Sequence, residues 1–93
     1  TIVKLNLNVY LLYWCGHCQQ MVSITDELDN NYLISQYNIN KINCLTSGFL
    51  CYKQRIFEFP TIQIENEEGV VLYKYFGPRN KQQIQKWLQT ISK

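Results

Sequence analysis

The segment Trp14–Cys18, with the sequence WCGHC, carries two cysteines separated by two residues. Cysteines at this spacing can form a small disulfide or supply half of a metal site. An apolar run from Leu5 to Leu12 leads into the segment, and a helix-like apolar pattern follows it. A strand that delivers the pair onto the first turn of a helix places Cys15 beside unpaired backbone N–H groups, which stabilise a thiolate. This setting favours a redox site.

The composition limits the classes of function. We expect one domain spanning residues 1–93, large enough for a modest core. The net charge of +2 and the scattered basic residues do not favour a nucleic acid or an anionic membrane as partner. The longest apolar run, Val9–Cys15, is too short to span a bilayer. Four cysteines in a small chain favour an oxidising compartment, although CxxC pairs also occur in the cytosol.

The first half of the chain follows a strand–helix–strand pattern. Apolar residues occupy the odd positions from Val3 to Val9, which predicts a strand with one buried face. Both faces become apolar over Tyr10–Leu12, as is typical of a central strand. The pattern predicts a helix over residues 17–36 and a second strand over Asn38–Cys44. A connection of this length implies that the two strands are parallel.

The second half predicts a short helix, a hairpin and a final helix. The short helix begins near Thr46–Gly48 and continues to about Ile56. Strands over Thr61–Glu65 and Val70–Phe76 form the hairpin, and Asn80 is the expected cap of the last helix. The apolar positions on these two helices are Phe49, Tyr52 and Ile56, and then Ile84, Trp87, Leu88 and Ile91. The predicted order is β-α-β-α-β-β-α, an α/β fold with a four-stranded mixed sheet.

This order, with its motifs, resembles the thioredoxin fold and, within it, an active domain of protein disulfide isomerase. The resemblance covers nearly all 93 residues, and CGHC is the isomerase form of the motif. Phe59-Pro60-Thr61 lies where that family carries a cis-proline loop. Gly77 and Arg79 are similar to the entry into the family's last helix. Lys41–Cys44 followed by Cys51 resembles isomerase domains that have a second, local cysteine pair.

Two departures from the family stand out. The strand and helix that usually precede the central strand are absent, and the polar face of Lys4, Asn6 and Asn8 fits a sheet side left partly uncovered. The family's buried acid is replaced by Val9, although Lys41 occupies the place of its usual partner. We therefore expect Lys41 to lack an acidic partner and to reach solvent. Resolution of a mixed disulfide should then be slow near neutral pH.

The motif assigns roles to the residues around the cysteine pair. Cys15 is the expected exposed nucleophile, and Cys18 is the resolving thiol that frees a trapped mixed disulfide. The partial positive charge of His17 should favour the Cys15 thiolate and so disfavour the disulfide form. The resemblance implies that Arg79 can swing towards Cys18 and lower its pKa. The alternative is that Cys15 and Cys18 are a structural disulfide or buried thiols, and that His17 and Arg79 are ordinary solvated surface residues.

Four further residues are candidates for substrate binding. Trp14 and Gly16 flank the nucleophile, and we expect Trp14 to pack beside the motif. A cis peptide bond between Phe59 and Pro60 would leave the preceding backbone free to pair with an extended substrate, whereas the alternative is an ordinary turn proline.

Outside this set, Cys44 and Cys51 are either free core thiols or a local disulfide that pins the short helix. A free pair would leave the short helix without a covalent tie to the sheet.

The expected function is thiol–disulfide exchange in cysteine-containing or partly unfolded proteins, by forming, reducing or isomerising their disulfides. Glutathione or another thiol–disulfide couple would be a partner, and we expect no cofactor and no metal. The endoplasmic reticulum lumen or another oxidising compartment is the expected location. One alternative is a redox-weak binding domain of a larger redox protein. Another is a zinc module built from the four cysteines.

Overall fold

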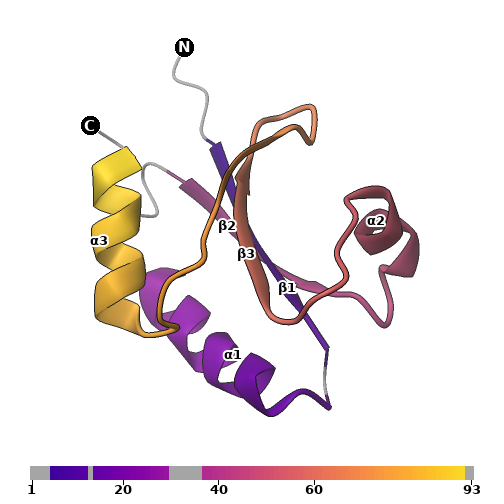
Figure 1. The fold of residues 1–93 in the computed structure, drawn as a ribbon, viewed down its shortest axis with the longest axis horizontal. Coiled ribbons are helices and arrows are strands. Elements are labelled where there is room, and N and C mark those ends of the chain that lie inside the picture. The colour runs from indigo at the N-terminus through magenta and orange to yellow at the C-terminus, as the bar shows by residue number, and fades with distance from the viewer. Residues whose placement is uncertain (1–4, 13, 30–36, 92–93) are drawn as a thin grey trace.

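The computed structural model describes residues 5–12, 14–29 and 37–91 (Figure 1). Val3, Lys4 and residues 30–36 of the predicted first helix therefore lie outside the described residues. The described elements are β1 (Leu5–Leu11), α1 (Gly16–Asp29), β2 (Tyr37–Asn43), α2 (Gly48–Lys53), β3 (Thr61–Glu65), β4 (Val71–Lys74) and α3 (Lys81–Ile91). This is the predicted order, and it forms the predicted thioredoxin-like α/β fold.

The four strands form one mixed sheet in the order β2-β1-β3-β4. β1 is parallel to β2 and antiparallel to β3, while β3 and β4 form an antiparallel hairpin. In this register Val9 of β1 lies opposite Lys41 of β2 on one side and Ile62 of β3 on the other. β1 is thus a central strand, as the apolar residues on both of its faces predict. Its carboxyl end leads directly to the cysteine pair.

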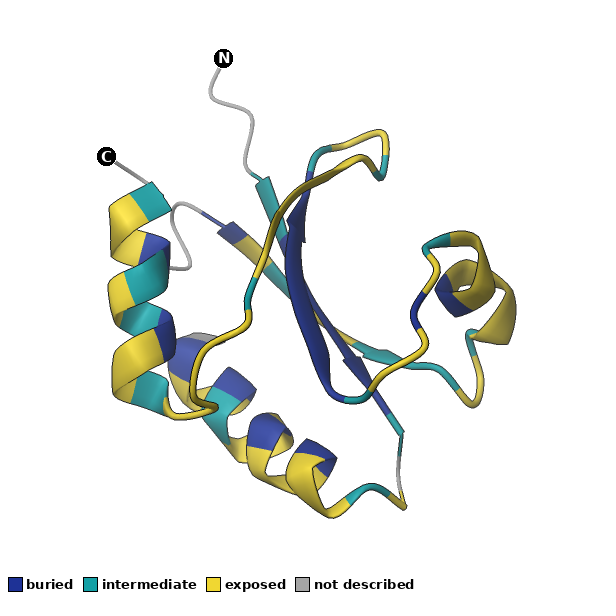
Figure 2. Cartoon of the chain, viewed as in Figure 1, coloured by how far each residue is buried: buried dark blue, intermediate teal, exposed yellow. Residues whose placement is uncertain are grey.

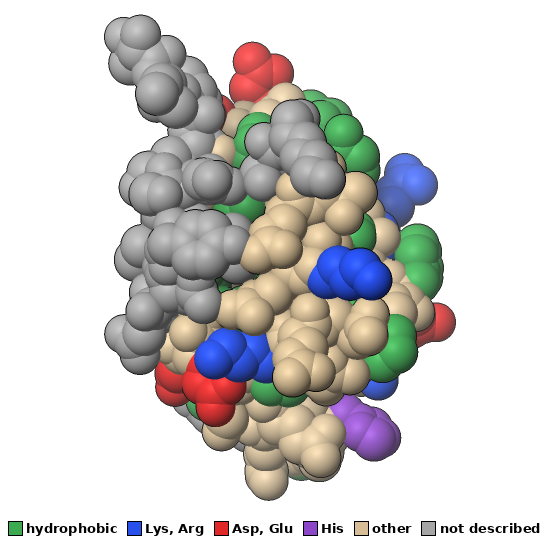
Figure 3. All heavy atoms as spheres, turned by 90° about the vertical axis from the view of Figure 1, so that its left-hand side faces the viewer, with side chains coloured by type: hydrophobic (Ala, Val, Ile, Leu, Met, Phe, Trp, Pro, Cys, Tyr) green, Lys and Arg blue, Asp and Glu red, His purple; other side chains and the backbone are tan. Residues whose placement is uncertain are grey.

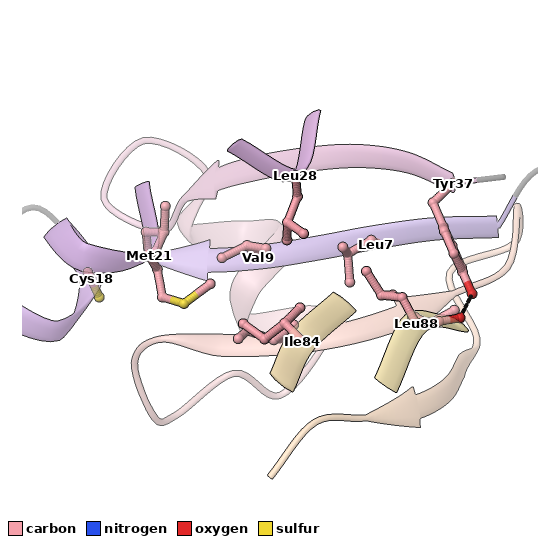
Figure 4. Packing of buried hydrophobic residues seen from close by; sticks show 11 residues of the cluster. Leu7, Val9, Cys18, Met21, Leu28, Tyr37, Ile84 and Leu88 are labelled. Atoms are coloured by element: carbon pink, nitrogen blue, oxygen red, sulfur yellow. Dashed lines mark hydrogen bonds between the residues drawn. The ribbon is translucent and has the colours of Figure 1, made fainter. Parts of the chain in front are cut away.

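One face of the sheet carries the main core. α1 and α3 pack together against this face (Figures 1 and 4). Figure 4 also shows the Tyr37 hydroxyl, which donates a hydrogen bond to the backbone oxygen of Leu88 at 2.9 Å. This bond ties the start of β2 to α3. The buried members of the core are Leu7, Val9, Leu11, Cys18, Met21, Leu28, Tyr37, Ile62, Ile64, Ile84 and Leu88.

The opposite face carries α2 and a polar cluster. Tyr10 packs with Cys51 and Ile56, and its hydroxyl donates a hydrogen bond to the buried carboxylate of Glu65. Gln63 donates a second hydrogen bond to Glu65, at 2.8 Å. All five residues of β3 are buried (Figure 2), so the outward positions of this strand are as inaccessible as the inward ones. Hydrogen bonds within the cluster offset the cost of burying its polar groups.

The expectation that Asn8 lies on an uncovered sheet face is wrong. Asn8 is buried, and its side-chain oxygen accepts a hydrogen bond from the Asn40 amide at 3.0 Å. Asn40 is its register partner on β2, so the two amides pair directly across the strands. Asn6, two residues earlier, is only partly buried.

The short helix is also shorter than predicted. α2 ends at Lys53, and Arg55 takes a positive φ of 59° that no helix allows. The predicted apolar face is wrong, because the side chains of Phe49 and Tyr52 are 82% and 73% exposed. Cys51 is instead the buried residue of α2. The predicted cap of α3 is confirmed: the Asn80 side-chain oxygen accepts a hydrogen bond from the backbone N–H of Gln83 at 2.9 Å.

The surface shows no single strongly charged region on the face drawn in Figure 3. Acidic and basic side chains are interspersed there, and one basic side chain lies directly beside an acidic group. Within the described residues, every helix is too short or too polar to cross a membrane. These findings agree with the small net charge and the short apolar runs of the sequence.

Candidate active site

The turn between β1 and α1 positions the cysteine pair. β1 ends at Leu11 and α1 begins at Gly16, so Cys15 immediately precedes the helix. Its backbone oxygen accepts hydrogen bonds from the N–H groups of Cys18 at 3.1 Å and Gln19 at 3.3 Å. Cys15 therefore occupies the N-cap position, where the free N–H groups of the first turn and the helix dipole favour negative charge.

The Cys15 thiol is partly exposed and polarised towards the thiolate. Its pKa is lowered, first by a hydrogen bond from the Cys18 thiol and then by the backbone N–H groups of Cys18 and His17. The positive charge of Arg79 contributes in the same direction. The thiol also lies 3.7 Å from the backbone oxygen of Phe59, to which it can donate. These contacts fit a nucleophilic thiol that faces an adjacent loop.

Cys18 has the opposite environment. It is the third residue of α1, is only 2% exposed, and belongs to the core cluster that includes Met21 (Figure 4). Burial raises the pKa of its thiol to about 11, because a thiolate there loses its solvation. A hydrogen bond from the backbone N–H of Leu12, at 3.5 Å, opposes this increase. The two thiols are both free and differ sharply in acidity.

The two basic candidates, His17 and Arg79, act on the cysteines in different ways. His17 is exposed, and the group of His17 that lowers the pKa of Cys15 is its backbone N–H. The predicted effect of the imidazole stays a prediction. Arg79 precedes α3 and lines a cavity of about 100 Å³ beside Pro60 and Phe76. Its charge lowers the pKa of both cysteines, in the direction that the resemblance implies.

The loop opposite the cysteines has the predicted backbone conformation. The Phe59–Pro60 peptide bond is cis, and the Thr61 hydroxyl donates a hydrogen bond to the backbone oxygen of Glu58 at 2.5 Å. The Trp14 side chain is 69% exposed, so it does not serve for packing. A Cβ atom at Gly16 would meet nothing within 4 Å, so space alone does not require glycine there. Substrate binding by these residues stays a prediction.

The other two cysteines form a disulfide. The sulfur atoms of Cys44 and Cys51 are 2.00 Å apart, and the bond joins the end of β2 to α2. The backbone N–H of Cys44 also donates to the Leu11 oxygen at 2.9 Å, next to the turn that carries the first pair. Because two of the four cysteines are bonded, a four-thiolate zinc site cannot form. Nor do the described residues contain another group of three or more His, Cys, Asp or Glu side chains able to hold a metal.

The expectation that Lys41 lacks an acidic partner is wrong. Its ammonium group forms an ion pair with the Asp26 carboxylate of α1. Asp26 is the acidic partner that the sequence interpretation missed. Cys18, Val22 and Asp26 recur every fourth residue, which places them along one side of a helix. That spacing was the available signal for an acid on the same side of α1 as Cys18.

Comparison with known proteins identifies the family. The thioredoxin family model matches residues 4–90. The chain is 27% identical over 78 residues to a probable protein disulfide-isomerase A6 of Medicago sativa, covering 83% of this chain and 21% of that protein. It is 34% identical over 70 residues to the protein disulfide isomerase-like 1-1 of Arabidopsis thaliana, covering 74% of this chain and 14% of that protein. The chain thus spans only a minor part of these relatives.

A solved structure of the first two thioredoxin domains of Naumovozyma dairenensis Eps1p has the same fold. It superposes with a TM-score of 0.82 at 22% identity, over 94% of this chain and 34% of that chain. The fold, the CGHC motif and the cis-proline loop agree with the match to the family model. The chain therefore belongs to the thioredoxin family, and its relatives within that family include protein disulfide isomerases.

Proposed function

We propose that this domain catalyses thiol–disulfide exchange in protein substrates through Cys15 and Cys18. The observation that carries the proposal is the contrast between two free thiols on one helical turn. Cys15 is accessible and has a lowered pKa, whereas Cys18 is buried and has a raised pKa. A thiolate is the form that attacks a disulfide, so this contrast favours Cys15 as the nucleophile and Cys18 as the second thiol.

The reaction follows from this division. The Cys15 thiolate attacks one sulfur of a substrate disulfide, a mixed disulfide forms, and the other substrate sulfur leaves as a thiolate that takes up a proton. Cys18 then loses its proton and attacks the Cys15 sulfur. The Cys15–Cys18 disulfide forms as the bond to the substrate breaks, and the substrate ends with two thiols. The reverse sequence donates a disulfide to a reduced substrate.

The surroundings of Cys15 support a polypeptide substrate. The Phe59 backbone oxygen lies 3.7 Å from the thiol and is available to an extended chain beside the cis-proline. The exposed Trp14 side chain offers an apolar contact next to the nucleophile. Partly unfolded proteins with accessible cysteines are therefore the proposed substrates, with Gly16 and Pro60 at the contact. Glutathione or a similar couple would restore the starting redox state.

The second disulfide supports an oxidising location. Structural disulfides persist in oxidising compartments, and Cys44–Cys51 is of this kind. We place the domain in the lumen of the endoplasmic reticulum or a comparable compartment. Its relatives named as protein disulfide isomerases support the same proposal.

The proposal is tested by insulin reduction and by reactivation of scrambled ribonuclease. Wild-type protein should be active in both assays, and Cys15→Ser should reduce the activity to the uncatalysed rate. Cys18→Ser should instead accumulate a mixed disulfide at Cys15, visible by mass spectrometry. The double substitution Cys44→Ser with Cys51→Ser is the matched control and should keep most of the activity. A wild-type protein no better than its Cys15→Ser variant would support a redox-weak binding domain.

A further inference from the structure

The two edges of the sheet differ in polarity. The strand order places β2 at one edge and β4 at the other, so each has one strand neighbour among the described residues. The exposed residues of β2 are Asn38, Asn40 and Lys41, which are all polar. Polar and charged side chains on an edge strand discourage pairing with another chain. The β2 edge is therefore protected against such pairing.

The β4 edge has a more apolar surface. All four of its residues are exposed (Figure 2), and three of them, Val71, Leu72 and Tyr73, are apolar. The exposed apolar residues continue on both sides of the strand, with Val70 before it and Phe76 after it. An apolar edge strand of this kind is a typical site for the addition of another strand.

The backbone of β4 also has bonding groups on its outer side. The N–H of Tyr75 donates a hydrogen bond to the Ile62 oxygen of β3 at 2.9 Å. Because successive residues of an antiparallel strand direct their backbone groups to opposite sides, the N–H and C=O of Lys74 point away from β3. A bulge leaves Leu72 without a register partner on β3. The bulge bends the edge, so an added strand can pair over only a few residues.

The charges at the two ends of this edge have opposite signs. Glu67 and Glu68 lie in the turn before β4, Lys74 ends the strand, and all three side chains are exposed. Within the described residues, none of the three forms an ion pair. An antiparallel second copy would bring the acidic end of each strand beside the basic end of the other, about a two-fold axis. A parallel copy would bring like charges together. The edge is thus complementary to itself.

We propose that the β4 edge pairs antiparallel with the β4 edge of a second copy of this chain, which forms a weak two-fold dimer. In the register centred on Leu72, Val71 lies opposite Tyr73 of the second copy, so apolar side chains meet. Lys74 then has Glu68 of the second copy as a diagonal neighbour on the same face. This pairing needs neither cysteine of the active pair and is independent of the proposed function.

The small size of the edge sets the expected affinity. β4 has only four residues, and its bulge shortens the pairing further. The interface should therefore be smaller than the roughly 800 Å² per partner that stable complexes bury, and we expect a dissociation constant on the order of 100 μM.

Sedimentation velocity of the Cys15→Ser variant, from about 10 μM to about 1 mM, tests the dimer. This variant cannot form dimers linked through the partly exposed thiol. Its sedimentation coefficient should rise with concentration towards that of a dimer. Leu72→Lys in this background places like charges at the two-fold axis, which doubles the effect, and should weaken association at least about tenfold. Asn38→Lys on the β2 edge is the matched control and should leave association unchanged.

A charge exchange gives a second test that alters only exposed side chains. Lys74→Glu and Glu68→Lys should each weaken the dimer about threefold at low salt, because each change places like charges beside one another. The double variant exchanges the two charges and should return to within about twofold of the starting affinity. Amide hydrogen exchange at Lys74 should slow as the protein concentration rises, because the pairing protects that N–H.

The outcomes decide between the second copy and other occupants of the edge. A protein that stays monomeric throughout the concentration range overturns the proposal, as does a dimer that Asn38→Lys weakens and Leu72→Lys does not. If circular dichroism shows that Leu72→Lys is unfolded, the charge exchange decides, and equal affinities in all its variants contradict the pairing. Exchange at Lys74 that slows with reduced, carboxymethylated ribonuclease, but not with protein concentration, assigns the edge to an unfolded polypeptide and also overturns the dimer.

Discussion

The two cysteine pairs lie at the same end of the sheet, yet their chemistry differs. Cys15 and Cys18 follow β1, whereas Cys44 and Cys51 follow the parallel neighbour β2. The first pair is a couple of free thiols, and the second is a closed disulfide. In each pair the first cysteine lies between a strand and the following helix, and the second lies in that helix. The residue type and the topology are therefore shared, and the difference must come from the local surroundings.

Exposure does not account for the difference, because each pair has one partly exposed cysteine and one buried cysteine. Spacing and position relative to the helix do. In the first pair one sulfur is accessible at a helix N-terminus, so substrate and solvent can reach the bond that the pair forms. In the second pair Cys51 is buried against Tyr10 and Ile56, and the cross-link closes a separate loop between strand and helix. A thiol that a helix N-terminus stabilises as a thiolate undergoes exchange readily, whereas a disulfide that closes a loop stabilises the fold. The first pair suits redox chemistry, and the second suits stabilisation.

The largest predicted effect is the difference in alkylation rate between Cys15 and Cys18 in the reduced protein. The pKa of Cys15 is lowered and that of Cys18 is raised to about 11, so near neutral pH their thiolate fractions should differ by at least about 100-fold. Labelling of Cys15 should fall only as the pH drops through its lowered pKa. Labelling of Cys18 should rise only as the pH approaches 11. Mass spectrometry of the protein with its Cys44–Cys51 bond intact measures both, and equal labelling would contradict the assignment.

Removal of the Cys44–Cys51 disulfide should lower the free energy of unfolding without changing the reactivity of Cys15. The bond links residues seven apart, and loop-closure entropy for so short a loop predicts a loss of about 2.5 kcal/mol for Cys44→Ala with Cys51→Ala. Urea unfolding followed by circular dichroism measures this loss, with Cys15→Ala, at a partly exposed position, as control. The alkylation rate of Cys15 should stay within about twofold. A tenfold change in that rate would mean that the two pairs are coupled and that their separation into two roles is wrong.

The sequence was sufficient for the parts of this contrast that depend on local pattern. Alternation of apolar residues predicted β1, and the WCGHC segment after it predicted the nucleophile at the start of a helix. The cis conformation of the Phe59–Pro60 bond followed from resemblance, because proline lowers the cost of that isomer without fixing it. For Cys44 and Cys51 the residues alone left two alternatives open, since spacing does not say whether two sulfurs meet.

The sequence was insufficient where distant residues meet on one face. The buried state of Glu65 depends on Tyr10, 55 positions away, and no periodicity in β3 indicates it. Phe49 and Tyr52 are exposed because α2 is short and its one buried residue, Cys51, turns them away from the sheet. The ion pair of Asp26 with Lys41 joins α1 to β2. Helical spacing indicates that Asp26 lies on the same side of α1 as Cys18, but it does not indicate which residue of the sheet faces it.

The smallest predicted effect concerns His17. It tests which group at this position keeps the Cys15 thiol reactive. The backbone N–H of His17 lowers the pKa of Cys15, and proline at this position has no N–H. His17→Pro removes both the N–H and the imidazole, whereas His17→Ala removes the imidazole alone. Loss of thiolate stabilisation makes the Cys15–Cys18 disulfide relatively more stable, so the reduction potential should become more negative.

A change of about one pKa unit at Cys15 corresponds to a shift of about 30 mV in that potential. Equilibration of each variant with glutathione buffers measures it. If the backbone N–H dominates, His17→Pro should shift the potential and His17→Ala should leave it nearly unchanged. Equal shifts in both variants would assign the effect to the imidazole, as the sequence pattern predicted. An unchanged potential in both variants would mean that position 17 does not affect the reactivity of Cys15. The thiol and backbone N–H of Cys18, together with Arg79, would then account for its lowered pKa.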